Sequence, residues 1–219
     1  MRLILASTSP RRHELLALLH VPFEIVAPTY VERVNPHHSP IDQARLFAEG
    51  KARSCRDLFA DSLIIGCDTL IDLDSNVVGK PTDSADAARM LQRFSGRQHL
   101  IHTAVTVIST STGKLQSAVE SVQVWFKHLS SSDVDTYVAT GESLGKAGAY
   151  GIQGSGAEFI ERIEGDYTAA VGLPLNTLAR LLRQFGMIVP IDLNNLYQQK
   201  AYPNWGRFPS TPRLEGRLQ

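Results

Sequence analysis

Hydroxyl and basic side chains gather near the amino end, where an apolar run gives way to a leucine-rich stretch. Ser9 and Pro10 are typical of a helix start, because serine can cap free backbone N–H groups and proline loses no hydrogen bond there. Arg11 and Arg12 then fall in the opening turn, where they oppose the helix dipole unless an anion offsets them. Together with Ser7 they predict a cradle for phosphate groups. A solvated arginine pair on a surface turn is the alternative.

A lone aspartate follows an apolar run that is typical of a buried central strand. Residues 63–67 are apolar, Asp68 and Thr69 interrupt them, and apolar residues resume at position 70. A carboxylate there is costly to desolvate without a cation or hydrogen bonds. If phosphates bind, Mg²⁺ is a fitting partner, since it takes one or two carboxylates plus phosphate oxygens and waters. Glu32, in a loop, is the candidate second carboxylate; ordinary acidic residues outside any site are the alternative.

Two lysines are candidates for neutralising phosphate charge. Lys51 lies beside the apolar stripe of a helix predicted from Ser39-Pro40 to about Phe59. Lys80 follows a predicted hairpin, whose exit should bring it back near Asp68. Lysines at helix faces and turns are usually solvated, so this alternative stays open.

The elements that must position these groups alternate between strands and amphipathic helices. Residues 145–154 contain too many glycines for either element, which is compatible with the wall of a ligand site. A turn at 111–113 favours an antiparallel pair of long strands on either side. The expected strands are 3–6, 23–26, 63–67, 70–73, 77–78, 99–109, 117–128 and 157–163, and the expected helices are 10–19, 39–59, 84–94, 130–139 and 172–186.

Composition excludes several classes of protein. The chain has 219 residues, 22 basic and 22 acidic side chains and no formal net charge, which argues against broad adhesion to nucleic acid or to anionic membranes. No apolar run is long enough to span a bilayer, and the start is too short for a signal peptide, so a cytoplasmic protein is expected. Cys55 and Cys67 read as buried hydrophobes.

Rival chemistries lack their motifs. The histidines lack the glutamate of a zinc-binding helix, and neither a GxxxxGK[ST] loop nor a GxGxxG fingerprint after a strand is present. A nucleophilic Ser–His–Asp system is left open, although no GxSxG elbow occurs.

Five ordered motifs resemble the Maf family of nucleoside triphosphate pyrophosphatases across residues 3–189. They are Ala6-Ser7-Thr8-Ser9-Pro10-Arg11-Arg12, Gly66-Cys67-Asp68-Thr69, Gly79-Lys80-Pro81, the run from Lys146 to Gly154, and Val171-Gly172-Leu173-Pro174-Leu175. The resemblance implies an α/β fold related to inosine triphosphate pyrophosphatases, with an elongated mixed β-sheet, flanking helices and two lobes around a deep cleft. It also implies a homodimer.

The resemblance also implies roles for single residues. Asp68 matches the family's catalytic aspartate, which acts as proton acceptor or metal ligand for Mg²⁺ or Mn²⁺. The remaining phosphate- and metal-binding positions match Ser7, Arg11, Glu32, Lys51 and Lys80, with Glu32 as the second metal ligand. The positions that distinguish substrate subgroups match Arg12, Thr69 and Gln153.

The Asp-Thr pair and the Gly-Ile-Gln-Gly loop resemble the dTTP/UTP branch rather than the 7-methyl-GTP branch. The expected activity is hydrolysis of a pyrimidine nucleoside triphosphate to the monophosphate and pyrophosphate. A non-catalytic nucleotide-binding regulator of septum formation, and an enzyme for modified bases, are the alternatives.

Residues 190–219 have no counterpart in this family, and prolines interrupt any period. We expect an irregular or partly disordered tail after a Maf-like domain of residues 1–189. Packing of Tyr197, Tyr202, Trp205 and Phe208 on a neighbouring surface is the alternative.

Overall fold

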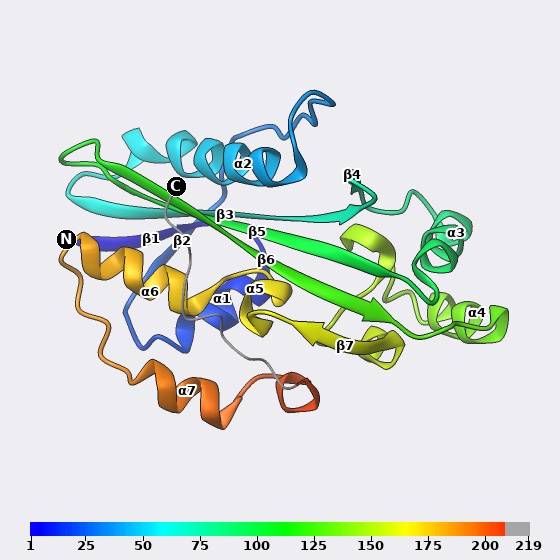
Figure 1. The fold of residues 1–219 in the computed structure, drawn as a ribbon. Helices are drawn as coiled ribbons and strands as arrows, with labels where there is room; N and C mark the ends of the chain where they lie inside the picture. The colour runs from blue at the N-terminus through cyan, green and yellow to red at the C-terminus, as the bar shows by residue number, and fades with distance from the viewer. Residues whose placement is uncertain (209–219) are drawn as a thin grey trace.

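One mixed β-sheet forms the centre of the molecule in the computed structural model, which describes residues 1–208 (Figure 1). Its order is β2-β1-β3-β5-β6-β7, and β4 pairs with the far end of β3. Strand β1 runs parallel to both β2 and β3, whereas the β3–β5, β5–β6 and β6–β7 pairs are antiparallel. The strands are β1 Arg2–Ala6, β2 Glu24–Val26, β3 Ser62–Leu73, β4 Asn76–Val78, β5 Gln98–Ser109, β6 Leu115–Phe126 and β7 Ile160–Glu164.

Helices cover both faces of the sheet. Helix α2 (Pro40–Ser54) lies on one face, and α1 (Pro10–Ala17), α5 (Tyr167–Val171) and α6 (Leu175–Gln184) lie on the other (Figure 1). Helices α3 (Ser84–Phe94) and α4 (Ser131–Ala139) lie at the end of the sheet where β4 lies. The predicted α/β class, with a mixed sheet and flanking helices, is therefore confirmed.

The difference in length between β1 and β3 opens the sheet at one place. Ala6, the last residue of β1, pairs with Gly66, while β3 continues for seven more residues. The same edge of β3 is paired again only from Ile71 onward, where β4 bonds to it. Residues 67–70 therefore lie on a free edge, where the loop after β1 and the start of α1 approach them.

Three local predictions differ from the structure. Strand β3 runs unbroken through Asp68, because both sides of the residue keep their pairing with β5. Residues 155–159 form a 3-10 turn ahead of β7, where a strand was expected from 157. Helix α5 was not predicted, because its five residues are too few to show a period.

The segment after residue 190 is also more regular than expected. Helix α7 (Leu193–Gln199) and a 3-10 turn over Trp205–Arg207 lie in the stretch that was predicted to be irregular. Aromatic burial explains the difference, since Trp205 is fully buried and Phe208 nearly so. The expectation for 209–219 lies outside the described residues. None of the helices within residues 1–208 has the length and apolar character needed to cross a bilayer.

Candidate functional site

A cleft of about 780 Å³ lies at the free edge of β3. It is bounded by the loop and helix start after β1, by the middle of β3, by residues 144–153 and by the turn between α5 and α6. All of the site residues expected from the sequence line it, namely Ser7, Arg11, Arg12, Glu32, Lys51, Asp68, Thr69, Lys80 and Gln153. The structure thus brings them together, while their roles stay predictions.

Asp68 and Lys51 form a buried ion pair on the α2 side of the sheet. Lys51 Nζ lies 2.5 Å from Asp68 Oδ1 and 2.5 Å from Glu32 Oε1. Lys51 is 8% exposed and Asp68 5% exposed, whereas the Glu32 side chain is 46% exposed. One ammonium group therefore holds a buried and a half-open carboxylate together.

The second oxygen of Asp68 is unsatisfied. Oδ2 is buried and has no hydrogen-bond partner among the described residues. Burial raises the pKa of Asp68, an effect that Lys51 and Arg12 oppose and Glu32 reinforces. An acceptor oxygen left without a donor is costly in a protein interior, so this atom is a candidate for binding a proton or a cation from a ligand.

Arg12 and Thr69 meet on the opposite side of β3, because successive strand residues point to opposite faces. Arg12 donates from Nε to Gly172 O at 2.9 Å and from Nη2 to Thr69 Oγ1 at 3.2 Å. Thr69 Oγ1 also lies 3.0 Å from Oγ1 of the fully buried Thr103, whose single proton is donated to Ala169 O at 2.8 Å. Because Thr103 uses its proton for Ala169 O, Thr69 donates to Thr103, and a lone pair on the Thr69 oxygen remains to accept a hydrogen bond from a ligand.

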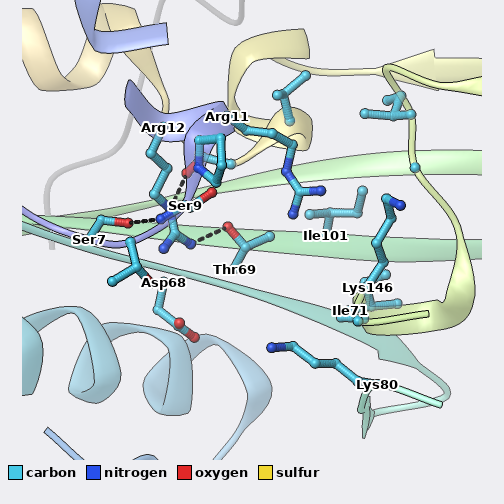
Figure 2. Close-up of a pocket in the computed structure, with 18 of the residues that line it drawn as sticks. Ser7, Ser9, Arg11, Arg12, Asp68, Thr69, Ile71, Lys80, Ile101 and Lys146 are labelled. Atoms are coloured by element: carbon cyan, nitrogen blue, oxygen red, sulfur yellow. Dashed lines mark hydrogen bonds between the residues drawn. The ribbon is translucent and has the colours of Figure 1, made fainter. Parts of the chain in front are cut away.

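Three cationic side chains enter the cleft from different elements. Figure 2 shows Arg11 from α1, Lys80 after β4 and Lys146 from the glycine-rich loop extending into it. Burial lowers the pKa of Arg11, and the neighbouring Arg12 adds to the effect. Burial likewise lowers the pKa of Lys146, with a contribution from Arg11. Mutual repulsion of these cations favours an anionic ligand between them.

The start of α1 forms as predicted, with one difference. Pro10 is the first helical residue, but the side chain of Ser9 makes no capping bond. The Ser9 N–H instead donates to Ser7 Oγ at 3.1 Å, as Figure 2 shows. At the start of α2, by contrast, Ser39 does cap the helix, accepting from the Asp42 N–H.

Sequence reasoning assigned no role to Lys146 or Thr103. Lys146 lies in the glycine-rich run of residues 145–154, and that run could have indicated that Lys146 lines a ligand site. Thr103 gives no such signal, because its position opposite Thr69 depends on the register of β3 and β5.

A Ser–His–Asp arrangement does occur, but away from the cleft. His102 Nδ1 lies 2.8 Å from Ser121 Oγ, and Nε2 lies 3.3 Å from Asp72 Oδ2. None of the three lines the cleft. The three residues lie on the adjacent strands β3, β5 and β6, where their hydrogen bonds join neighbouring strands of the sheet.

The fold and the cleft together define an α/β protein with a cationic pocket beside a buried carboxylate. The family model described as Maf-like protein matches residues 2–185, and the chain belongs to this family, as the resemblance predicted. A dTTP/UTP pyrophosphatase of Bacillus cytotoxicus is 44% identical over 184 residues, which is 84% of this chain and 95% of that protein. One of Bacillus cereus is 41% identical over 188 residues, 86% of this chain and 97% of that protein.

A solved nucleoside-triphosphatase (dITP/XTP pyrophosphatase) from Mycobacterium abscessus aligns with a TM-score of 0.43 and 17% identity, over 87% of this chain and 100% of that chain. At this TM-score the alignment carries no conclusion about the present chain.

Proposed function

We propose that this protein hydrolyses dTTP and UTP to the nucleoside monophosphate and pyrophosphate. One observation carries the proposal: within the described residues, five cationic side chains and two carboxylates line one cleft of a chain without net charge. The names of the Bacillus relatives support the choice of pyrimidine triphosphates.

The carboxylates fit a divalent cation that arrives with the nucleotide. The described residues contain no cluster of three or more His, Cys, Asp or Glu side chains that would form an all-protein metal site. Mg²⁺ and Mn²⁺ do not need one when phosphate oxygens complete the shell, and Asp68 Oδ2 and Glu32 are available oxygens. When bound there, the metal would neutralise charge on the phosphates.

The chain's own residues bind the phosphates and handle the proton. Arg11, Lys80 and Lys146 bind the triphosphate, because each extends into the cleft without a carboxylate partner at ion-pair distance among the described residues. Asp68 accepts the proton of a water that attacks the α phosphorus. The bond to the bridging oxygen breaks, and pyrophosphate leaves.

The side of β3 that carries Thr69 would receive the base. Thr69 offers its hydroxyl oxygen as an acceptor, Gln153 offers an amide, and Arg12 holds Thr69 in place. Hydrogen-bonded recognition discriminates strongly, because a wrong base leaves such groups unpaired. The divalent metal, the homodimer and a cytoplasmic location stay predictions.

Product analysis with a panel of triphosphates tests the proposal. We expect pyrophosphate rather than phosphate from dTTP and UTP, and less from purine triphosphates. A regulator that only binds would be stabilised thermally by nucleotide and release nothing. Faster turnover of methylated or deaminated bases would instead favour an enzyme for modified nucleotides.

Asp68→Asn tests the proposed role of Asp68 as the base, because asparagine has nearly the same shape as aspartate. It keeps an acceptor for Lys51 but removes the base, so we expect pyrophosphate release to fall by about a hundredfold or more. The melting temperature should stay near that of the wild type, because Lys51 keeps Glu32 as its counter-ion, and this separates loss of chemistry from loss of fold. Turnover at the wild-type rate would exclude the proposed role of Asp68.

A further inference from the structure

A C-terminal segment outside the family match lies against the cleft. The Maf-like match ends at residue 185, whereas residues 193–208 form α7 and the turn that follows it. We call residues 193–208 the C-terminal segment. Two of its side chains reach the loop of residues 152–154, which carries Gln153.

The segment is firmly attached to α5 and α6. Tyr197 donates to Asp166 Oδ2 at 2.8 Å and accepts from the Asn176 N–H at 3.2 Å. The ring of Trp205 stacks on Tyr167 at 5.8 Å between centroids, and Tyr167 in turn donates to Pro203 O at 2.5 Å. Buried aromatic packing of this kind holds a short segment in one position.

Asn204 fixes the backbone of the loop. Its Nδ2 donates to Ile152 O at 3.2 Å and to Gly154 O at 3.1 Å, so one amide bridges the residues on both sides of Gln153. Asn204 has a φ of 62°, a left-handed conformation that asparagine tolerates better than most residues.

Tyr202 contacts the side chain of Gln153 itself. Its hydroxyl donates to Glu14 Oε2 at 2.6 Å, and the same proton makes a longer, weaker second contact with Gln153 Oε1 at 3.4 Å. Burial and the neighbouring Glu14 raise the pKa of Tyr202, so the hydroxyl keeps its proton. Glu14 belongs to α1, the helix whose first turn carries Arg11 and Arg12, and Tyr202 therefore links both walls of the cleft.

An amide presents donors on one side and an acceptor on the other, so its orientation decides which base edge it matches. Uracil and thymine carry a carbonyl and a ring N–H where cytosine carries an amine and a bare ring nitrogen. We infer that Tyr202 is a positioning residue that holds the Gln153 amide, making the C-terminal segment a determinant of selectivity between uracil or thymine and cytosine. This inference rests on the proposed function, because the proposed function places the base beside Gln153.

Tyr202→Phe tests the inference, since it removes one hydroxyl and keeps the ring. We expect the ratio of kcat/KM for dTTP to that for dCTP to fall about twofold to threefold, mainly through KM, because a long, shared hydrogen bond lies at the weak end of the range for such bonds. Tyr197→Phe is the control, because it removes a hydroxyl of the same segment that contacts α5 and α6. It should lower the melting temperature and leave the ratio unchanged.

The Gln153→Ala background shows whether Tyr202 acts through Gln153. There, Tyr202→Phe should change the ratio no further. An unchanged ratio in Tyr202→Phe, an equal fall in Tyr197→Phe, or a persisting effect in the Gln153→Ala background would each overturn the inference.

Affinities for non-hydrolysable dTTP and dCTP analogues are measured in parallel. If wild-type protein binds the analogues but releases no pyrophosphate, the proposed function fails, and the ratio of affinities still decides the role of Tyr202. Wild-type protein that binds neither analogue would overturn both proposals.

Discussion

Lys51 is the cation on which the buried carboxylate depends. It lies within 2.5 Å of oxygens of both Asp68 and Glu32, and only Glu32 is open to solvent. Removing one partner of a buried pair leaves the other charge uncompensated, which costs more than the pair contributes when intact. We therefore expect Lys51→Met to lower the free energy of unfolding by about 3 kcal/mol at neutral pH.

Urea unfolding checks this expectation, with Lys51→Met/Asp68→Asn as the comparison. The double variant has no buried charge at this place, so it should recover most of the lost stability. A Lys51→Met protein as stable as the wild type would show that Asp68 does not depend on Lys51 for its burial.

Single residues were predictable where their type conflicted with their surroundings. Asp68 interrupts an apolar run, and Arg11 and Arg12 stand at the wrong end of a helix for their charge; each conflict indicated the cleft. Hydrogen-bond partners were not predictable, because they depend on distances of tenths of an ångström. The capping bond expected of Ser9 is absent, and its N–H uses the hydroxyl of Ser7 instead.

At the level of secondary-structure elements, the distance between α2 and β3 sets the geometry of the ion pair between Lys51 and Asp68. Gly66 lies two residues before Asp68, where a Cβ atom would come within 2.1 Å of Ala48 O and 2.7 Å of Ala52 N on α2. Both contacts are with backbone, which cannot move unless the helix does. Gly66→Ala should therefore push α2 away from the strand and separate Lys51 from Asp68.

We expect Gly66→Ala to lower the free energy of unfolding by about 2 kcal/mol and to reduce turnover. Gly79→Ala is the matched control, because a Cβ there meets no atom within 4 Å. Its stability should change by less than about 0.5 kcal/mol. Equal stability of the two variants in thermal or urea unfolding would show that Gly66 is not needed for close packing.

Elements with a clear hydrophobic period were predictable, and those defined by packing were not. The β5–β6 pair and α3 form where alternation and helical spacing placed them. The stretch from residue 190 was expected to be irregular because of its prolines, yet burial of Trp205 organises the described part of it. Aromatic residues without a period predict burial poorly until their partners, here Tyr167 and Tyr197, are known.

At the scale of the whole molecule, the charge of the chain and the charge of the cleft are different quantities. Composition gave equal numbers of acidic and basic residues, from which we expected no broad binding of nucleic acid. Folding nonetheless brings Arg11, Arg12, Lys51, Lys80 and Lys146 to one place from four separate parts of the chain. Only the topology, with β1 shorter than β3, creates that place.

The global stability of the fold should depend on pH through His99 at the other end of the sheet. His99 is 3% exposed, its Nε2 lies 2.7 Å from the Tyr150 hydroxyl, and its ring packs against Phe94 and Phe126. Its Nδ1 finds no partner in residues 1–208. Burial lowers the pKa of His99 to about 3, so the imidazole is neutral in the folded protein.

In the unfolded chain the same imidazole takes a proton near pH 6.5, the ordinary value for histidine. Between about pH 6.5 and pH 3 the unfolded state therefore binds more protons through this residue, and the free energy of unfolding falls as the pH falls. The contribution of His99 to this slope is up to about 1.4 kcal/mol per pH unit. Above pH 6.5 the residue contributes no slope.

His99→Gln isolates the contribution, because glutamine does not titrate and can still bond to the Tyr150 hydroxyl. The variant should be less stable than the wild type at pH 7, since it loses ring packing. Between pH 6 and pH 4 its free energy of unfolding should fall less steeply, by about 1 kcal/mol per pH unit, because the other titrating groups are common to both proteins. Parallel curves from urea unfolding across this range would show that His99 does take up a proton in the folded state, against its apolar surroundings.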